Sequence, residues 1–186
     1  MSTSGADVPL LETERLRLRP HRIDDLGDCA AMWGDEIVAR HIGGKTFTPE
    51  EVWWKILRYA GLWSLLGFGY WALEDKATGR FAGEVGFADF HRDITPPFGD
   101  QPESGWVFAP WAHGAGLATE AVRAVLAWGD ENLRSPSTVC AIDPGNLASI
   151  RVAEKCGYRD PRPITYEGVS LLRFERDSSG MPAKAL

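Results

Sequence analysis

The cysteines of this sequence are too few and too scattered to indicate a metal site. The sequence has three cysteines, Cys29, Cys140 and Cys156, which is an odd number. None of them forms a CxxC pair, and none lies near a histidine in sequence. We therefore expect reduced thiols in the protein core and no bound metal.

Long apolar runs and a basic N-terminal leader are also missing. The longest apolar stretch, residues 60–71, is interrupted by glycines and is too short to span a bilayer. We expect a cytoplasmic protein that has no membrane partner.

Basic residues are in the minority. The formal net charge is -6 and the isoelectric point is near 5.2, which argues against a protein that grips nucleic acid through clustered lysine and arginine. We expect no nucleic-acid partner and favour a cationic or amine-bearing one.

The overall composition is that of one globular domain. The chain has 186 residues, of which 44% are hydrophobic and 25% charged, and this length and balance suit a single packed core. We place the domain at residues 9–176. Residues 1–8 and 177–186 lack periodicity and are predicted to be flexible termini.

Alternating and helical spacings of apolar residues predict an α/β order of elements. Helices are expected from Asp24 or Asp25 to residue 33, from 48 to about 66, from 117 to about 133, and from Asn146 to 157. Strands are expected at 16–20, 70–74, 81–90, 103–108, 139–142, 164–166 and 169–176. The proline-rich segment 93–102 is predicted to be a loop.

A glycine turn opens the best predicted helix. Gly114 and Gly116 follow a strand end and directly precede the helix that begins at Leu117. Backbone amides in such a turn and at a helix start attract phosphate, and glycine lets the phosphate approach the main chain. The turn is therefore a candidate pyrophosphate cradle, although glycines at these positions could also serve only to shape the turn.

A second helix start lies about 30 residues later. Asn146 and Ser149 occupy the cap and the first turn of the helix that ends at Gly157. Taken alone, this pair could be simply a helix cap.

Three motifs in order carry a family resemblance: the glycine turn, the Asn146-x-x-Ser149 helix start and Glu154-Lys155-x-Gly157-Tyr158. Through them the chain resembles the GNAT superfamily of N-acetyltransferases, and within it the RimJ/RimL type. The resemblance covers roughly residues 11–176. It implies an α/β (α+β) fold in which helices flank a mixed, mostly antiparallel sheet of about seven strands. The sheet is splayed between its fourth strand, 103–109, and its fifth, 139–142. Acetyl-CoA is the implied co-substrate.

The resemblance also implies roles for individual residues. Main chain at Phe108 and Ala109 holds the pantetheine and polarises the thioester carbonyl, Asn146 reaches the pantetheine, and Ser149 lies near the sulfur. The pyrophosphate is bound by the turn and the helix start, which comprise His113, Gly114, Ala115, Gly116, Leu117, Ala118 and Thr119.

Two residues depart from the family pattern. Trp111 stands where many relatives have Gln or Arg, which leaves the turn amides as the expected phosphate ligands. Ala153 stands where many members have a tyrosine that protonates the leaving thiolate. Ser149 is the expected replacement, as the RimJ/RimL branch suggests.

Two carboxylates are candidates for the general base, directly or through a water molecule. Alternation places Glu84 on the face of its strand opposite Phe81, Val85 and Phe87, and Glu103 begins the strand that leads to the cofactor. Either residue could instead be a solvated strand carboxylate.

Two further residues are weaker candidates. Glu167 precedes the last predicted strand, and His113 lies inside the phosphate turn, where a histidine more often contributes only its amide.

The sequence therefore predicts an N-acetyltransferase that moves the acetyl group of acetyl-CoA to a primary amine by direct attack in a ternary complex. The acceptor is a small molecule or a protein N-terminus, and the protein is a monomer or a homodimer. Without a strong base, an α-amine is favoured, because deprotonation at pH 7 costs ~1.4 kcal/mol for an α-amine and ~4.6 for lysine.

The sequence also permits two other functions. One is a non-catalytic acyl-CoA-binding sensor, which the missing tyrosine permits. The other is a nicotinamide-dependent oxidoreductase, because Gly114-x-Gly116-x-x-Thr119 superficially resembles a dinucleotide turn. Its position after a meander of strands argues against the second function.

Overall fold

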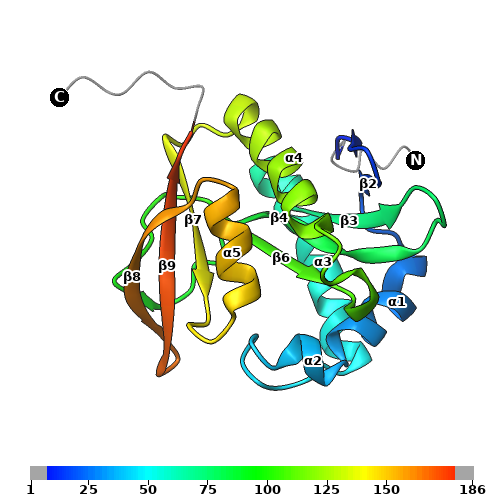
Figure 1. The fold of residues 1–186 in the computed structure, drawn as a ribbon, viewed down its shortest axis with the longest axis horizontal. Helices are drawn as coiled ribbons and strands as arrows, with labels where there is room; N and C mark the ends of the chain where they lie inside the picture. Colours follow the sequence, from blue (N-terminus) through cyan, green and yellow to red (C-terminus); the bar gives the residue numbers. More distant parts are fainter. Residues whose placement is uncertain (1–7, 179–186) are drawn as a thin grey trace.

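A nine-stranded mixed sheet runs through the computed structural model, which describes residues 8–178 (Figure 1). Every neighbouring pair is antiparallel except β6 and β7. In spatial order the strands are β1 (Leu11–Glu12), β2 (Leu16–Arg19), β3 (Tyr70–Asp75), β4 (Phe81–Ala88), β6 (Glu103–Phe108), β7 (Ser137–Ile142), β9 (Val169–Asp177), β8 (Arg159–Tyr166) and β5 (Ile94–Thr95).

The helices begin at recognisable sequence signals. Thr48 and Glu51 form a reciprocal capping box at the start of α3, and the side chain of Asp35 accepts from two amides at the start of α2. The helices are α1 (Leu26–Trp33), α2 (Glu36–Ala39), α3 (Pro49–Leu66), α4 (Leu117–Asn132) and α5 (Leu147–Lys155), with short 3-10 turns η1 (Ile23–Asp25) and η2 (Pro110–Ala112).

The helices divide between the two faces of the sheet (Figure 1). On one face, α4 and α5 bury apolar side chains such as Val122, Val125 and Ala153 against strand residues that include Val85 and Phe87. We call this the helix α4 face. The cluster on this face holds more buried residues than the other two clusters of the described residues, and each large apolar side chain buried in it contributes ~1.5–3 kcal/mol.

The opposite face carries α1 and α3. Cys29 and Trp33 of α1 and Val52 of α3 pack with Ala72 of β3 and Phe81 of β4. We call this the helix α3 face, and it is the face on which the Glu84 side chain lies, since Cys29 and Trp33 also hydrogen-bond Glu84.

A bulge in β4 corrects one prediction. Alternation had put Phe81 on the face opposite Glu84, but the β3–β4 register shifts so that Leu73 pairs with Gly83 and Glu74 with Phe81. The extra residue, Ala82, turns Phe81 onto the same face as Glu84.

The sheet is splayed between β6 and β7. These parallel strands are paired at Glu103 and Val139 alone among the residues that the structure describes. Beyond that point the facing edges of the two strands are free of each other, as the family resemblance implied for this position.

Most predicted elements are confirmed, with three additions. The sheet has nine strands within residues 8–178, where about seven were expected, because β1 and β5 contribute two residues each. Segment 93–102 is therefore not entirely loop, since Ile94 and Thr95 pair with β8. The helix α2 was not predicted, and β8 begins five residues earlier than expected, at Arg159.

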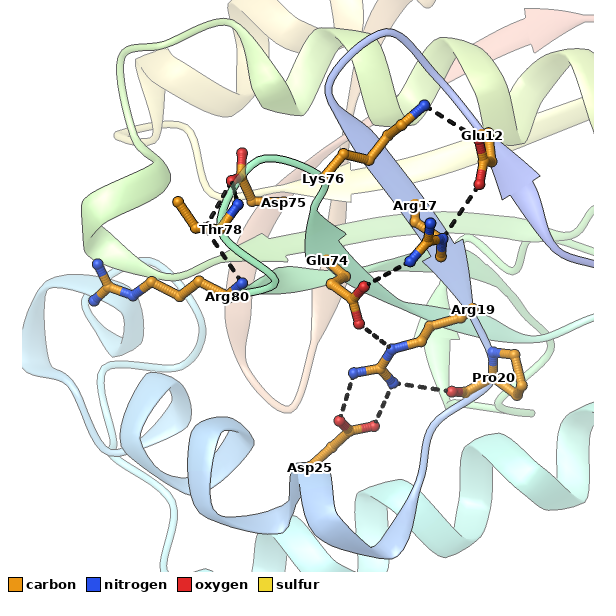
Figure 2. Close-up of polar contacts among 10 residues, drawn as sticks. All are labelled: Glu12, Arg17, Arg19, Pro20, Asp25, Glu74, Asp75, Lys76, Thr78 and Arg80. Atoms are coloured by element: carbon orange, nitrogen blue, oxygen red, sulfur yellow. Dashed lines mark hydrogen bonds and ion pairs between the residues drawn. The ribbon is translucent and has the colours of Figure 1, made fainter.

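The start of α1 is tied to the sheet by a chain of ion pairs (Figure 2). Arg19 binds Asp25 through two hydrogen bonds of 2.8 and 2.7 Å and Glu74 through a third of 3.0 Å, and Arg17 binds the other oxygen of Glu74. The Arg19–Asp25 pair is buried, so this network fixes the β2–α1 connection from inside the protein.

The ends of the described segment are attached to the core. Val8 packs against the main cluster, Asp177 closes β9, and Ser178 donates to the carbonyls of Pro136 and Ser135. These three residues of the predicted flexible termini have ordered contacts, and the other parts of that prediction, 1–7 and 179–186, lie outside the described residues. Among residues 8–178, no helix combines the length and apolarity that a membrane span needs.

Candidate active site

The turn before α4 has the geometry of an anion cradle. Gly114 and Gly116 have φ values of +75° and +80°, which side-chain-bearing residues rarely adopt. A Cβ at Gly114 would meet nothing within 4 Å, and one at Gly116 would meet only Arg15. Gly116 is the N-cap of α4. The first amides of the helix therefore border open space and carry the partial positive charge of a helix start.

Arg15, from the β1–β2 turn, contacts the turn before α4, and the sequence did not predict this contact. Its guanidinium donates to the carbonyl of Ala115 at 2.9 Å and pairs with Glu120 at 2.6 Å. Thr13 also donates to Glu120, at 2.6 Å. The β1–β2 turn thus clamps the first turn of α4 and brings a guanidinium to the turn, where Trp111 supplies none.

The main chain at the end of β6 points in two directions. The amide of Ala109 donates to Ala82 in β4, and its carbonyl accepts from Ala112. Because successive residues of a strand point their polar groups to opposite edges, the amide of Phe108 faces the edge toward β7. The structure therefore favours Phe108 over Ala109 as a main-chain donor to a thioester in the splay.

His113 takes part in the same arrangement through its side chain. Its Nε2 lies 2.9 Å from the carbonyl oxygen of Phe108. The predicted contribution of this residue was its amide alone, and the ring contact adds a link between the turn and the end of β6.

The start of α5 lies beside the other strand of the splay. Asn146 caps the helix, with its side-chain oxygen accepting from the amide of Ser149 at 3.1 Å. Among residues 8–178, neither the Asn146 side-chain nitrogen nor the Ser149 hydroxyl has a hydrogen-bond partner. Both groups are thus available to a ligand, whereas Ala153 is fully buried in the core.

Glu84 is enclosed by hydrogen-bond donors. The residue is 1% exposed, and its oxygens accept from Trp33 Nε1 at 3.0 Å, Tyr59 Oη at 3.2 Å, His21 Nε2 at 3.2 Å and Cys29 Sγ at 3.4 Å. Burial alone raises the pKa of Glu84, but the hydrogen bonds from His21, Trp33 and Cys29 hold it below its usual range. This carboxylate is a structural anchor for α1 and α3.

The same cluster is the one place where the described residues gather three possible metal ligands. Ligand atoms of His21, Cys29 and Glu84 all lie within 4.8 Å of one another. The hydrogen bonds to Glu84 account for this proximity. Burial also raises the pKa of the Cys29 thiol, which keeps it a donor to the carboxylate. The three cysteines are free thiols and buried, as predicted.

Glu103 lies at the vertex of the splay. Its carboxylate pairs with Arg92, from the segment between β4 and β5, and its side chain is 13% exposed. The third predicted carboxylate, Glu167, lies exposed in the β8–β9 turn at a φ of +49°. Of the three candidates, only Glu103 adjoins the point where β6 leaves β7.

Cations gather on the helix α3 face although the whole chain is acidic. The guanidinium groups of Arg58 and Arg92 lie 4.7 and 5.2 Å from the ring centre of Phe90. The Lys55 amine lies over the Trp33 and Phe47 rings, 4.0 and 4.1 Å from their centres, and burial together with the nearby charge of Arg58 lowers its pKa to about 8. The net charge of the chain therefore does not describe this neighbourhood.

Comparisons with known proteins agree with this geometry. Residues 15–159 match the profile of the Acetyltransferase (GNAT) domain. The chain is 33% identical over 172 residues to the uncharacterized protein YkkB of Bacillus subtilis (strain 168), covering 90% of this chain and 95% of YkkB.

Solved structures share the fold over the same extent. A putative GnaT-family acetyltransferase from Bordetella pertussis superposes with a TM-score of 0.78 and 31% identity, covering 91% of this chain and 99% of that one. RimL, a ribosomal L7/L12 alpha-N-protein acetyltransferase solved with coenzyme A, superposes with a TM-score of 0.72 at 12% identity, covering 93% and 100% of the two chains.

The matched domain spans the clamped α4 turn, the splay between β6 and β7 and the start of α5. It leaves no ground for a nicotinamide-dependent oxidoreductase. The chain belongs to the GNAT family of acetyltransferases, which take their acyl group from acetyl-CoA.

Proposed function

We propose that this protein is an N-acetyltransferase that moves the acetyl group of acetyl-CoA to a primary amine, either of a small molecule or of a protein N-terminus. The observation that carries the proposal is the placement of two helix starts, those of α4 and α5, beside the strand edges that β6 and β7 leave free. The helix starts suit an anionic cofactor, and the free edges suit an extended pantetheine.

The residues present fit coenzyme A. The Gly114 and Gly116 conformations leave the space that a Cβ would otherwise occupy, Arg15 adds positive charge, and the Phe108 amide faces the splay. When bound, the cofactor supplies an acetyl thioester, which the amine attacks so that the carbon–sulfur bond breaks. Amides of the α4 start would hold the pyrophosphate, and Asn146 would hold the pantetheine.

Ser149 is the proposed donor to the leaving sulfur. Its hydroxyl is unpartnered among the described residues and lies in the first turn of α5, where the helix start also stabilises negative charge. Ala153 has no proton to give, so the serine hydroxyl would pass its proton to the thiolate and recover one from solvent.

Glu103 is the proposed acceptor of the amine proton, through water or directly. Glu84 was an equal candidate in sequence, but its four donors and its burial leave it no free lone pair toward a substrate. Arg92 is the ion-pair partner of the Glu103 carboxylate. No strong base adjoins the splay in residues 8–178, which suits an amine that is largely neutral near pH 7, so an α-amine remains the favoured acceptor over an unperturbed lysine.

The cations on the helix α3 face argue against a highly charged acceptor. Arg58 is exposed and has no carboxylate partner within residues 8–178, and Arg92 is already used by Glu103. A polyamine would bring several positive charges close to them. We therefore infer a preference for acceptors with a single amine, in place of the cationic acceptor that the net charge suggested.

The deciding experiment measures thiol release from acetyl-CoA across a panel of amines. The panel contains a peptide with a free α-amino group, the same peptide N-terminally blocked and carrying one lysine, and spermidine. We expect the free peptide to give the highest kcat/KM at pH 7. Calorimetric binding of acetyl-CoA without thiol release by any amine would identify a sensor, and preference for the blocked lysine peptide would show that a stronger base is present.

A further inference from the structure

The Tyr70 hydroxyl occupies an unusual position on β6. Tyr70, Gly86 and Gly105 form one row across β3, β4 and β6. A Cβ placed on Gly105 would lie 2.0 Å from Tyr70 Oη. The tyrosine thus reaches across β4, where Gly86 offers no side chain to block it, and its hydroxyl takes the space that a side chain at position 105 would fill.

This hydroxyl has no hydrogen-bond partner anywhere in the described part of the chain. Tyr70 is 8% exposed, and its hydroxyl oxygen retains some contact with solvent. Buried hydroxyls normally find a partner, because an unpaired polar group costs ~1–3 kcal/mol. A hydroxyl that remains open on an otherwise buried ring is therefore available to a ligand.

The neighbouring tyrosine shows what a structural hydroxyl looks like in the same stack. Tyr59 and Tyr70 are stacked with ring centres 4.6 Å apart and planes at 14°. The Tyr59 hydroxyl donates to Glu84 at 3.2 Å. The Tyr59 hydroxyl is therefore bound to a buried carboxylate, whereas the Tyr70 hydroxyl lies beside Gly105 of β6.

The location is where an acceptor must approach. Gly105 lies two residues beyond Glu103, where β6 loses its pairing with β7. The helix starts proposed to hold the cofactor belong to α4 and α5, so an amine that attacks through the splay comes from the helix α3 face. Tyr70 Oη lies on that face, between the Glu103 position and the free end of β6.

We propose that the Tyr70 hydroxyl, exposed by Gly105, is part of the acceptor subsite and hydrogen-bonds the acceptor amine at the splay. The proposal rests on the function proposed above. The phenol oxygen accepts one amine N–H while the nitrogen lone pair points toward the acyl carbon, and the proton released on attack goes to Glu103 or to water. Tyr70 remains a neutral phenol throughout, because burial raises its pKa.

The test compares two single-hydroxyl deletions, Tyr70→Phe and Tyr59→Phe, with the panel amine that wild type uses most efficiently. Both variants keep the stacked rings. We expect Tyr70→Phe to lower kcat/KM for the amine at least tenfold while the KM for acetyl-CoA changes less than twofold. Tyr59→Phe should lower the melting temperature and leave kcat/KM within threefold of wild type.

Gly105→Ala supplies an independent arm. Its methyl group would displace the Tyr70 hydroxyl, so the variant should lose as much kcat/KM for the amine as Tyr70→Phe. In the double variant the remaining ring carbon would be 3.2 Å from the methyl group, and the two losses should not add, because both changes remove one interaction.

The outcomes separate the two proposals. If wild type acetylates the amine and Tyr70→Phe stays within threefold, or if Tyr70→Phe and Tyr59→Phe lose equally, the Tyr70 assignment is wrong and the function stands. If wild type releases no thiol with any amine, the proposed function fails and the assignment fails with it.

Discussion

Arg15 and Glu120 form an ion pair that holds the turn before α4 in place from outside. The Arg15 guanidinium contacts the Glu120 carboxylate at 2.6 Å and the Ala115 carbonyl at 2.9 Å, so one side chain fixes both the turn and the helix that follows it. Arg15→Met should weaken coenzyme A binding by about tenfold, or ~1.4 kcal/mol, as measured by calorimetry.

Arg17→Met is the matched control for this prediction. Arg17 is equally exposed, but it pairs with Glu12 and Glu74, away from the turn. Its loss should leave cofactor affinity unchanged. If the two variants bind coenzyme A with equal affinity, Arg15 does not contribute to cofactor binding.

Gly116→Val tests the cradle itself. A side chain at this position would be strained at a φ of +80° and would project into the space proposed for the pyrophosphate. We expect coenzyme A affinity to fall at least tenfold. Gly79→Val carries similar strain at a φ of +70° in the β3–β4 turn, where no ligand is proposed. If both variants bind coenzyme A as wild type does, the cradle assignment is wrong.

Ser149→Ala separates binding from proton donation. If the hydroxyl protonates the leaving sulfur, kcat should fall more than the affinity for acetyl-CoA falls, since the interaction matters mainly in the transition state. Steady-state kinetics and calorimetry on the same preparation provide both numbers. Equal losses would make the serine a binding residue only, and no loss in either would point to water as the acid.

The buried Arg19–Asp25 pair should make stability depend on pH in the acid range. Burial opposes ionisation of Asp25, but Arg19 and the Arg22 amide hold its pKa below the usual value, and hydrogen bonding to Arg19 lowers the pKa of Glu74 (Figure 2). Carboxylates with depressed pKa values stabilise the fold above their unfolded pKa, about 4, and lose this contribution as the pH falls through the folded pKa.

Arg19→Met leaves Asp25 buried without its partner and should cost ~3–5 kcal/mol at pH 7. Without Arg19, burial raises the pKa of Asp25 in the folded variant, so its carboxylate is protonated at a higher pH than in wild type. The difference from wild type should therefore begin to shrink above the unfolded pKa of about 4 and continue to shrink as the pH falls further. Urea unfolding at several pH values measures it, with the exposed Arg17→Met variant expected to cost at most ~1 kcal/mol. A difference that does not change with pH would show that Asp25 is not the group involved.

Local sequence signals were sufficient for most of the fold. The capping box at Thr48, the cap at Asn146 and the glycine stop at Gly157 each specify a boundary through neighbouring residues, and the structure has the corresponding helices. The bulge at Ala82 shows the limit of such reasoning. Counting alternate residues assumes an unbroken ladder, and one extra residue moved Phe81 to the other face.

The site was predicted less completely, because its side chains meet through tertiary contacts. Glu84 and Glu103 were equal candidates for the general base in the sequence, and only their hydrogen-bond and ion-pair partners in the structure distinguish them. Those partners, such as Trp33 for Glu84 and Arg92 for Glu103, come from other elements, with no spacing rule to connect them. Arg15 lies 105 residues before Glu120, so its contact with the turn before α4 could not be predicted from the glycine motif.

The outer edge of the sheet has a consequence for the order in which the chain folds. Within residues 8–178, β5 joins the sheet only through β8, and β8 joins the other strands only through β9. Ile94 thus pairs with a residue, Tyr166, that is synthesised much later. Pulse-labelled hydrogen exchange should find amides of β5 protected after those of β3 and β4, and simultaneous protection would contradict this order. The segment that carries Arg92, the partner of Glu103, therefore lacks its sheet neighbour until β8 and β9 have been synthesised. A ribosome-bound intermediate that already contains the turn before α4 would still lack this support for Arg92.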